Sequence, residues 1–122
     1  MKYLLSIYGN DEVWASIPKE EFQRIVAATD AHNKEMAEAG ELLFACGVGP
    51  LEDIRRVSVA AEGDVVVTDG PYLETKEYLG SFYIVDVPTI ERAQQLAAGM
   101  PSATFTQVEV WPIHHGGSID DL

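Results

Sequence analysis

A strand–helix–strand pattern that occurs twice is the feature that most constrains how this chain folds. In each unit, two short runs rich in apolar and β-branched residues flank a segment whose apolar residues recur at three- and four-residue steps, which is typical of a helix between two strands. The first unit places strand, helix and strand at residues 2–8, 18–40 and 41–48, and the second places them at 81–87, 88–99 and 106–113. The two units therefore form a loose repeat.

A predicted hairpin separates the two units. Residues 55–61 and 64–68 flank the turn signal Glu62-Gly63, and such a pattern is typical of two antiparallel strands. The order β-α-β, hairpin, β-α-β is that of the ferredoxin-like split βαβ pattern, so we expect an α+β fold with a four-stranded antiparallel sheet and both helices on one face. The length of 122 residues predicts one domain at 1–113, followed by a tail at 114–122.

The first helix is expected to begin at Pro18 and to be ended by Gly40. Its apolar stripe consists of Phe22, Ile25, Val26, Thr29, Met36 and Ala37. At 100° per residue, Asn33 falls in the middle of this stripe and His32 falls at its edge. A buried amide must find hydrogen-bond partners, so Asn33 is either a core residue bonded to backbone or a residue that contacts a ligand.

The face of the sheet that carries no helix also needs a cover. Apolar residues compete for this face, namely Leu4, Tyr8, Phe82 and Ile84. The economical cover is a second copy of the chain, so we expect a two-fold homodimer with sheet packed against sheet.

Composition excludes some partners. The chain has 8 basic and 20 acidic residues and a net charge of −12, which disfavours nucleic acid and anionic membrane, because both require a positive surface. No apolar run approaches the roughly 18 residues of a membrane-spanning helix. The single cysteine, Cys46, cannot form an internal disulfide, and a cytoplasmic location is expected.

The segment VTDGPYLETKEYLG at residues 67–80 differs from its surroundings. Asp69-Gly70-Pro71 is typical of a turn, because aspartate bonds its own backbone and glycine takes a positive φ. The segment is too long for a tight hairpin, and residues 73–78 favour a short helical turn above the sheet. It is therefore either a structural element with surface ion pairs or the wall of a pocket in which Lys76 tunes Asp69.

The run VTDGPYLETKEYLGSFYIVDV closely resembles the signature of the DGPF (DGPFAETKE) branch of the YCII-related family. The similarity extends to HNKEMAEAGELLFACGVGP upstream and QVEVWPI downstream. It implies a dimeric α+β barrel built on a ferredoxin-like protomer. It also implies a suspected enzymatic activity that depends on a histidine and an aspartate, since one relative resembles a dehydrohalogenating lyase of aromatic breakdown. Other members are encoded near extracytoplasmic-function sigma factors.

The resemblance also supplies the candidate site residues. Asp69 and His32 are the expected catalytic pair, although the family histidine falls near Thr29 in this chain and His32 lies one turn later. Four residues are expected to bind a ligand or to form a structural clasp between the loop and the first helix: Asn33, Tyr72, Lys76 and Glu77. Tyr72 stands where phenylalanine is usual, and Trp111 stands where arginine is common.

Three functions remain open at this point. The first is a cofactor-independent lyase or isomerase in which burial makes Asp69 a general base and His32 is its partner. The second is a non-catalytic, ligand-binding or regulatory dimer, and the resemblance implies sigma-factor regulation as one such role. The third is a purely structural role for the loop. We expect no metal, because His32 and Glu35 form only a pair and no further ligands complete a site.

Overall fold

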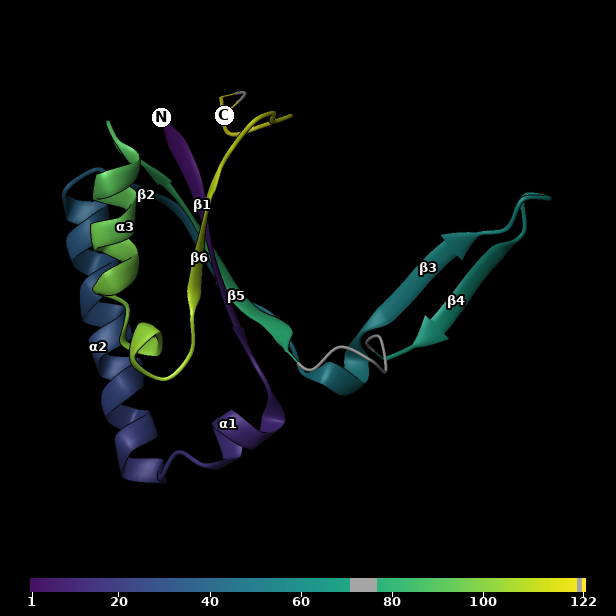
Figure 1. The fold of residues 1–122 in the computed structure, drawn as a ribbon, viewed down its shortest axis with the longest axis horizontal. Helices are drawn as coiled ribbons and strands as arrows, with labels where there is room; N and C mark the ends of the chain where they lie inside the picture. Colours follow the sequence, from purple (N-terminus) through teal and green to yellow (C-terminus); the bar gives the residue numbers. More distant parts are fainter. Residues whose placement is uncertain (71–76, 121) are drawn as a thin grey trace.

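The structure is a computed structural model that describes residues 1–70, 77–120 and 122. Its main layer is a four-stranded antiparallel sheet with the order β2-β5-β1-β6. The strands are β1 (Lys2–Gly9), β2 (Leu42–Gly47), β5 (Tyr78–Asp86) and β6 (Val108–Pro112). Two helices, α2 (Lys19–Glu38) and α3 (Ile90–Ala98), cover one face of this sheet (Figure 1). The fold is the predicted ferredoxin-like α+β arrangement.

Strand register separates the core from the opposite face. Leu5 on β1 lies opposite Tyr83 on β5 and Val110 on β6, and these side chains point toward the helices. Alternate residues of β1 point to the other side, which we call the outer face. There Leu4 lies opposite Ile84 and Trp111. The core consists of Tyr3, Leu5, Ile7, Met36, Tyr83, Val85, Val87, Ala93, Leu96, Ala97 and Met100.

The predicted apolar stripe of α2 is buried only near the C-terminal end of the helix. Met36 is fully buried, whereas Phe22 and Val26 are exposed. The expectation of a continuous core stripe was therefore wrong for a single chain. The N-terminal turns of α2 extend beyond the end of α3 (Figure 1), so the second helix does not cover them. Gly40 follows the helix with a φ of +73°, as predicted for the residue that ends it.

A short helix that the sequence did not suggest follows β1. Helix α1 (Asp11–Ala15) is capped by Asn10, whose side chain accepts a hydrogen bond of 2.7 Å from the backbone N–H of Val13. Strand β5 also begins at Tyr78, three residues before the predicted start. Of the helical turn expected at 73–78, residues 73–76 lie outside the described residues, and Tyr78 belongs to a strand.

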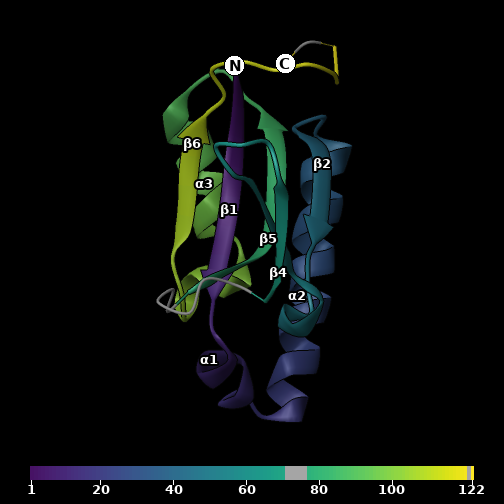
Figure 2. The same ribbon diagram turned by 90° about the vertical axis from the view of Figure 1, so that its right-hand side faces the viewer.

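The predicted hairpin forms a separate two-stranded sheet. Strand β3 (Arg55–Val59) pairs with β4 (Val65–Asp69), and we call residues 55–69 the arm. The arm projects from the main sheet on the side away from the helices (Figures 1 and 2). It makes no extensive contact with any other helix or strand of the described chain. Short 3₁₀ turns precede the arm at Leu51–Asp53 and follow α3 at Pro101–Thr104.

An ion pair joins the start of β2 to α3. Nε and Nη2 of the Arg92 guanidinium each donate to one oxygen of the Glu41 carboxylate at 2.8 Å. The side chain of Glu41 is only 15% exposed, and the hydrogen bond from Arg92 holds the pKa of this carboxyl below its usual value. Within the described residues, no helix is both long and apolar enough to cross a membrane.

Candidate functional site

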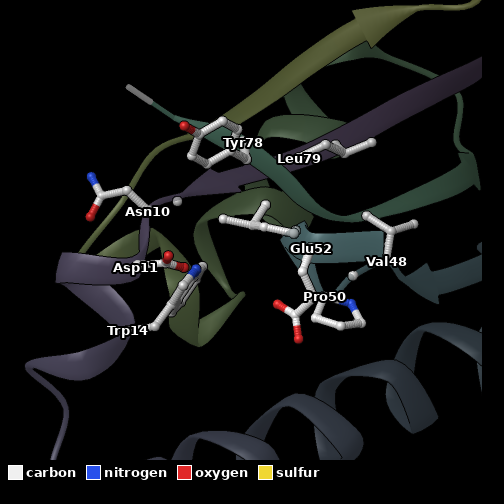
Figure 3. Close-up of a pocket in the computed structure, with 12 residues that line it drawn as sticks. Asn10, Asp11, Trp14, Val48, Pro50, Glu52, Tyr78 and Leu79 are labelled. Atoms are coloured by element: carbon white, nitrogen blue, oxygen red, sulfur yellow. The ribbon is translucent and has the colours of Figure 1, made fainter. Parts of the chain in front are cut away.

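A cavity of about 220 Å³ lies at the end of the main sheet, between α1 and the segment that leads into the arm. We call it the corner pocket. Three parts of the chain supply its walls: the end of β1 with α1, the segment after β2, and the beginning of β5. Its walls include Asp11, Trp14, Val48, Glu52, Tyr78 and Leu79 (Figure 3). Segments far apart in the sequence therefore meet at one small space.

Glycines allow Trp14 to form part of this wall. A Cβ atom on Gly9 would collide with the six-membered ring of the Trp14 indole, and a Cβ atom on Gly80 would lie 3.7 Å from the same ring. The indole also packs edge-on against Phe105, with ring centroids 5.7 Å apart. Close approach to two glycines and one aromatic ring holds Trp14 in place beside the cavity.

The polar groups of the corner pocket are mainly acceptors. Figure 3 shows Asp11 beside Trp14 on one side of the space and Glu52 beside Pro50 on the other. Tyr78 adds an aromatic ring with a hydroxyl group. No lysine or arginine is found among the described residues of the wall. The arrangement is suited to a small ligand with an apolar body and hydrogen-bond donors.

A second hollow, of about 470 Å³, lies on the outer face of the sheet. Its walls are uncharged and consist of Leu4, Ser6, Tyr8, Leu79, Phe82 and Trp111. The indole N–H of Trp111 donates to the Glu109 carboxylate at 3.1 Å, which holds the ring at the edge of this hollow. The face that was predicted to need a cover is uncovered in one chain.

His32 lies between the two helices. Its Nε2 lies 2.9 Å from the carbonyl oxygen of Leu96 on α3, at hydrogen-bond distance. A Cβ atom on Gly99, the residue that caps α3, would lie only 2.7 Å from Cε1 of the imidazole. The ring is therefore packed against the end of α3, and in this position it joins the two helices.

Asp69 occupies a different part of the molecule, where the arm begins and ends. Its carboxylate lies 3.2 Å from Nε of Arg55 across the hairpin, and its side chain is 86% exposed. Gly70, which follows, has the positive φ expected for the turn, +80°. Asp69 does not line the corner pocket, and one chain does not bring it together with His32, which lies in the helix layer.

Asn33 contacts the core of the sheet. It forms a side-chain hydrogen bond with the Tyr83 hydroxyl on β5, while its own Oδ1 is buried without a partner. Burial raises the pKa of Tyr83, and the hydrogen bond from Asn33 opposes that rise. The described partner of Asn33 therefore comes from β5.

The remaining predicted site residues belong to the 67–80 segment. Glu77 is exposed and lines a shallow pocket with Val13 and Phe105. Tyr72 and Lys76 lie outside the described residues. Among the residues that the structure describes, no group of three or more histidine, cysteine, aspartate or glutamate side chains is arranged to hold a metal ion.

Sequence reasoning missed the corner pocket. The sequence pattern predicts a strand at 2–8 and a helix from Pro18, and it predicts no helix between them. The signal that was available is local: Asn10 followed by two acidic residues is typical of a capped helix start, and the helix brings Trp14 back over Gly9. No sequence signal placed Glu52 or Tyr78 beside it, because that proximity arises from strand pairing.

Comparisons with known proteins agree with the resemblance to the YCII-related family. The sequence profile of the YCII-related domain matches residues 1–114. A curated relative named "Uncharacterized protein R00369", from Rhizobium meliloti (strain 1021), is 31% identical over 108 residues, which are 84% of this chain and 82% of the relative.

Proposed function

Because the chain belongs to the YCII-related family, we propose that it is a small-molecule-binding protein that acts as a homodimer and holds its ligand in the corner pocket. The observation that carries this proposal is the pocket itself. It is a concave space of about 220 Å³ with two aromatic rings and two carboxylates on its walls. A mostly apolar cavity with a few convergent polar groups is the usual form of a small-molecule site.

The walls favour one class of ligand. Asp11 and Glu52 repel an anion and attract a cation, and the rings of Trp14 and Tyr78 stabilise a cation that lies over them. The space has the size of a compact metabolite. We therefore propose a small amine, with an aromatic or aliphatic body, as the ligand.

The proposal requires only that a ligand binds in the corner pocket, and catalytic turnover of that ligand would be a further property. A lyase or isomerase at this pocket would take its proton-transfer groups from Asp11, Glu52 and Tyr78, because Asp69 and His32 do not line it. A regulatory protein would need only the binding step. Product formation from a bound ligand distinguishes these two forms.

The chain offers a built-in test, because it has two tryptophans and each lies in a different hollow. In a Trp111→Phe variant, Trp14 is the only indole and its emission reports the corner pocket. In a Trp14→Phe variant, Trp111 reports the outer face. A panel of small amines, carboxylates and neutral aromatic compounds is titrated into both variants.

We expect amines to change the emission of Trp14 and carboxylates to leave it unchanged. Glu52→Gln should weaken amine binding about fivefold, since one close charge pair at a partly exposed site contributes on the order of 1 kcal/mol. The matched control is Glu91→Gln, which removes an exposed carboxylate on α3. If carboxylates bind better than amines, or if ligands change only Trp111, the proposed site is wrong.

The homodimer is supported by the uncovered outer face. Leu4, Tyr8, Phe82 and Trp111 form an apolar surface on a chain that otherwise carries a net charge of −12. Sedimentation equilibrium at micromolar concentration should give twice the chain mass of 13.4 kDa. A single species of 13.4 kDa would refute the dimer and leave the test of the corner pocket unaffected.

A further inference from the structure

The arm has one apolar side and one more polar side. Residues that lie opposite each other in an antiparallel pair project to the same side, and so do alternate residues of one strand. Val57 lies opposite Val67 and Val59 lies opposite Val65, so these four valines form one surface, which we call the valine side. The ion pair of Arg55 and Asp69 projects to the same side at the base of the arm. The opposite side carries Arg56, Ser58, Val66 and Thr68.

The valine side faces water in a single chain. Its four residues are each 57–66% exposed, whereas Val66 on the opposite side is 43% exposed. Strand β3 alternates as Val57-Ser58-Val59, which is the pattern of a strand that covers a core with one face, whereas β4 is apolar from Val65 to Val67. In this arm that face covers nothing within the described chain.

An isolated two-stranded hairpin is at best marginally stable in water. The arm keeps a regular register of five residue pairs, closed by Arg55 and Asp69 at its base. Four exposed valines would add an aggregation-prone surface to it. The four valines therefore need a permanent cover. A second copy of the chain can supply it, because every copy is always accompanied by others in equal amount.

The outer face of the sheet offers the complementary surface. The arm projects on the same side of the molecule as this face (Figures 1 and 2), so two copies related by a two-fold axis each present both surfaces to the other. The hollow there is lined by six uncharged side chains, with the Glu109 carboxylate at its edge. The four valines are uncharged, and the two charges on their side of the arm, Arg55 and Asp69, neutralise each other in an ion pair at its base. Two acidic chains approach most favourably through surfaces that carry little net charge.

We propose that the two copies exchange arms, so that the valine side of each arm covers the outer-face hollow of the other copy. The hollow at Leu4, Tyr8, Phe82 and Trp111 is then open in one chain and closed by the arm of the second. This inference rests on the proposed homodimer and names the segment that holds it together. The arm is thus a dimer clasp that comes from residues 55–69.

Two pairs of substitutions test the arm. Val57→Thr with Val67→Thr changes two facing residues on the valine side, and Ser58→Thr with Val66→Thr changes two facing residues on the opposite side. All four place a β-branched threonine in the strand, which preserves the hairpin. Sedimentation velocity over a concentration series then gives the dimer dissociation constant of each variant.

We expect the valine-side pair to raise this constant by at least tenfold and the opposite-side pair to change it less than twofold. If both pairs leave the dimer unchanged, the exchange of arms is wrong and the dimer stands. If the unmodified chain is a monomer, the dimer proposal fails as well, so the two failures are distinguishable.

Disulfide trapping tests where the arm lies. In a Cys46→Ser background, one tagged chain carries Val67→Cys and a differently tagged chain carries Tyr8→Cys or Leu79→Cys. Oxidation of the co-expressed chains should give a covalent heterodimer with at least one of the two outer-face positions. Pairing with a control chain that carries Glu38→Cys on α2 should remain at background. Disulfides that form only between two arms, or equally with the control, overturn the proposal.

Discussion

The contact between His32 and Gly99 allows a quantitative test of the role of His32. Gly99 has a φ of −77°, so alanine fits its backbone without strain. Its new Cβ, however, would lie 2.7 Å from Cε1 and 3.1 Å from Nε2 of His32, whereas ordinary contacts begin at 3.4 Å. The imidazole must therefore move by several tenths of an ångström, away from the position in which it bonds the Leu96 carbonyl at 2.9 Å.

The size of the effect follows from these terms. Loss of the hydrogen bond costs about 1 kcal/mol and overpacking costs about 1–3 kcal/mol. Replacing glycine by alanine also stabilises the protein by about 0.4–1 kcal/mol, because it lowers the conformational entropy of the unfolded chain. Gly99→Ala should thus lower the free energy of unfolding by about 1–3 kcal/mol. In a His32→Ala background, the collision is absent, and the same substitution should be neutral or stabilising by up to about 1 kcal/mol.

Urea unfolding of the four proteins of this cycle, followed by circular dichroism, measures the coupling between the two sites. We expect a coupling energy of at least about 1.5 kcal/mol, which exceeds the roughly 0.5 kcal/mol found for independent sites. If Gly99→Ala costs the same in both backgrounds, His32 does not pack against α3 as described. It would then be free for the catalytic role that its sequence position suggested.

Three further predictions concern single interactions. Arg92→Met should destabilise the protein at pH 7. Because Arg92 lowers the folded-state pKa of Glu41 below its usual 4.5, the stability that this pair contributes is fully present above that unfolded-state value and is lost as pH falls through the folded-state pKa. In a series of urea titrations the variant and the unmodified protein should therefore converge in the acid range, below the folded-state pKa of Glu41. Asn33→Leu removes a buried acceptor that has no partner and also a hydrogen bond to Tyr83, so the two effects should offset and leave stability within about 1 kcal/mol in thermal unfolding. Asp69→Asn removes one exposed ion pair, so it should lower the free energy of unfolding by less than about 1 kcal/mol. Its effect should be additive with that of Asn33→Leu, and a coupling energy above about 0.5 kcal/mol would support the predicted clasp.

Local pattern was enough to predict the architecture. The alternation in residues 2–8 and the long helical period ending at Gly40 correspond to β1 and α2. The hairpin at 55–68 was also predicted, because its two β-branched runs flank a turn signal. These elements depend on short-range sequence properties, and for that reason they are found where the sequence placed them.

The candidate site could not be predicted in the same way. The corner pocket requires that α1, the segment before the arm and the start of β5 meet, and that meeting depends on strand order and not on any one motif. The expected pairing of His32 with Asp69 used family resemblance instead. In one chain, His32 packs against α3 and Asp69 lies on the arm. A motif thus identified which residues are unusual, and the fold determined what they contact.

The exposure of apolar residues in this chain follows one rule. Phe22 and Val26 on α2, the valine side of the arm, and the hollow around Trp111 all carry the sequence pattern of buried surface, yet all are open in a single chain. A sequence pattern indicates which residues are buried in the functional assembly, whereas the structure of one chain shows only the burial that this chain achieves by itself. Where the two disagree at several places at once, the missing cover is most economically a second copy, because a two-fold operation supplies every surface twice. In the proposed dimer, the exposed valines would form part of a core that two chains build together.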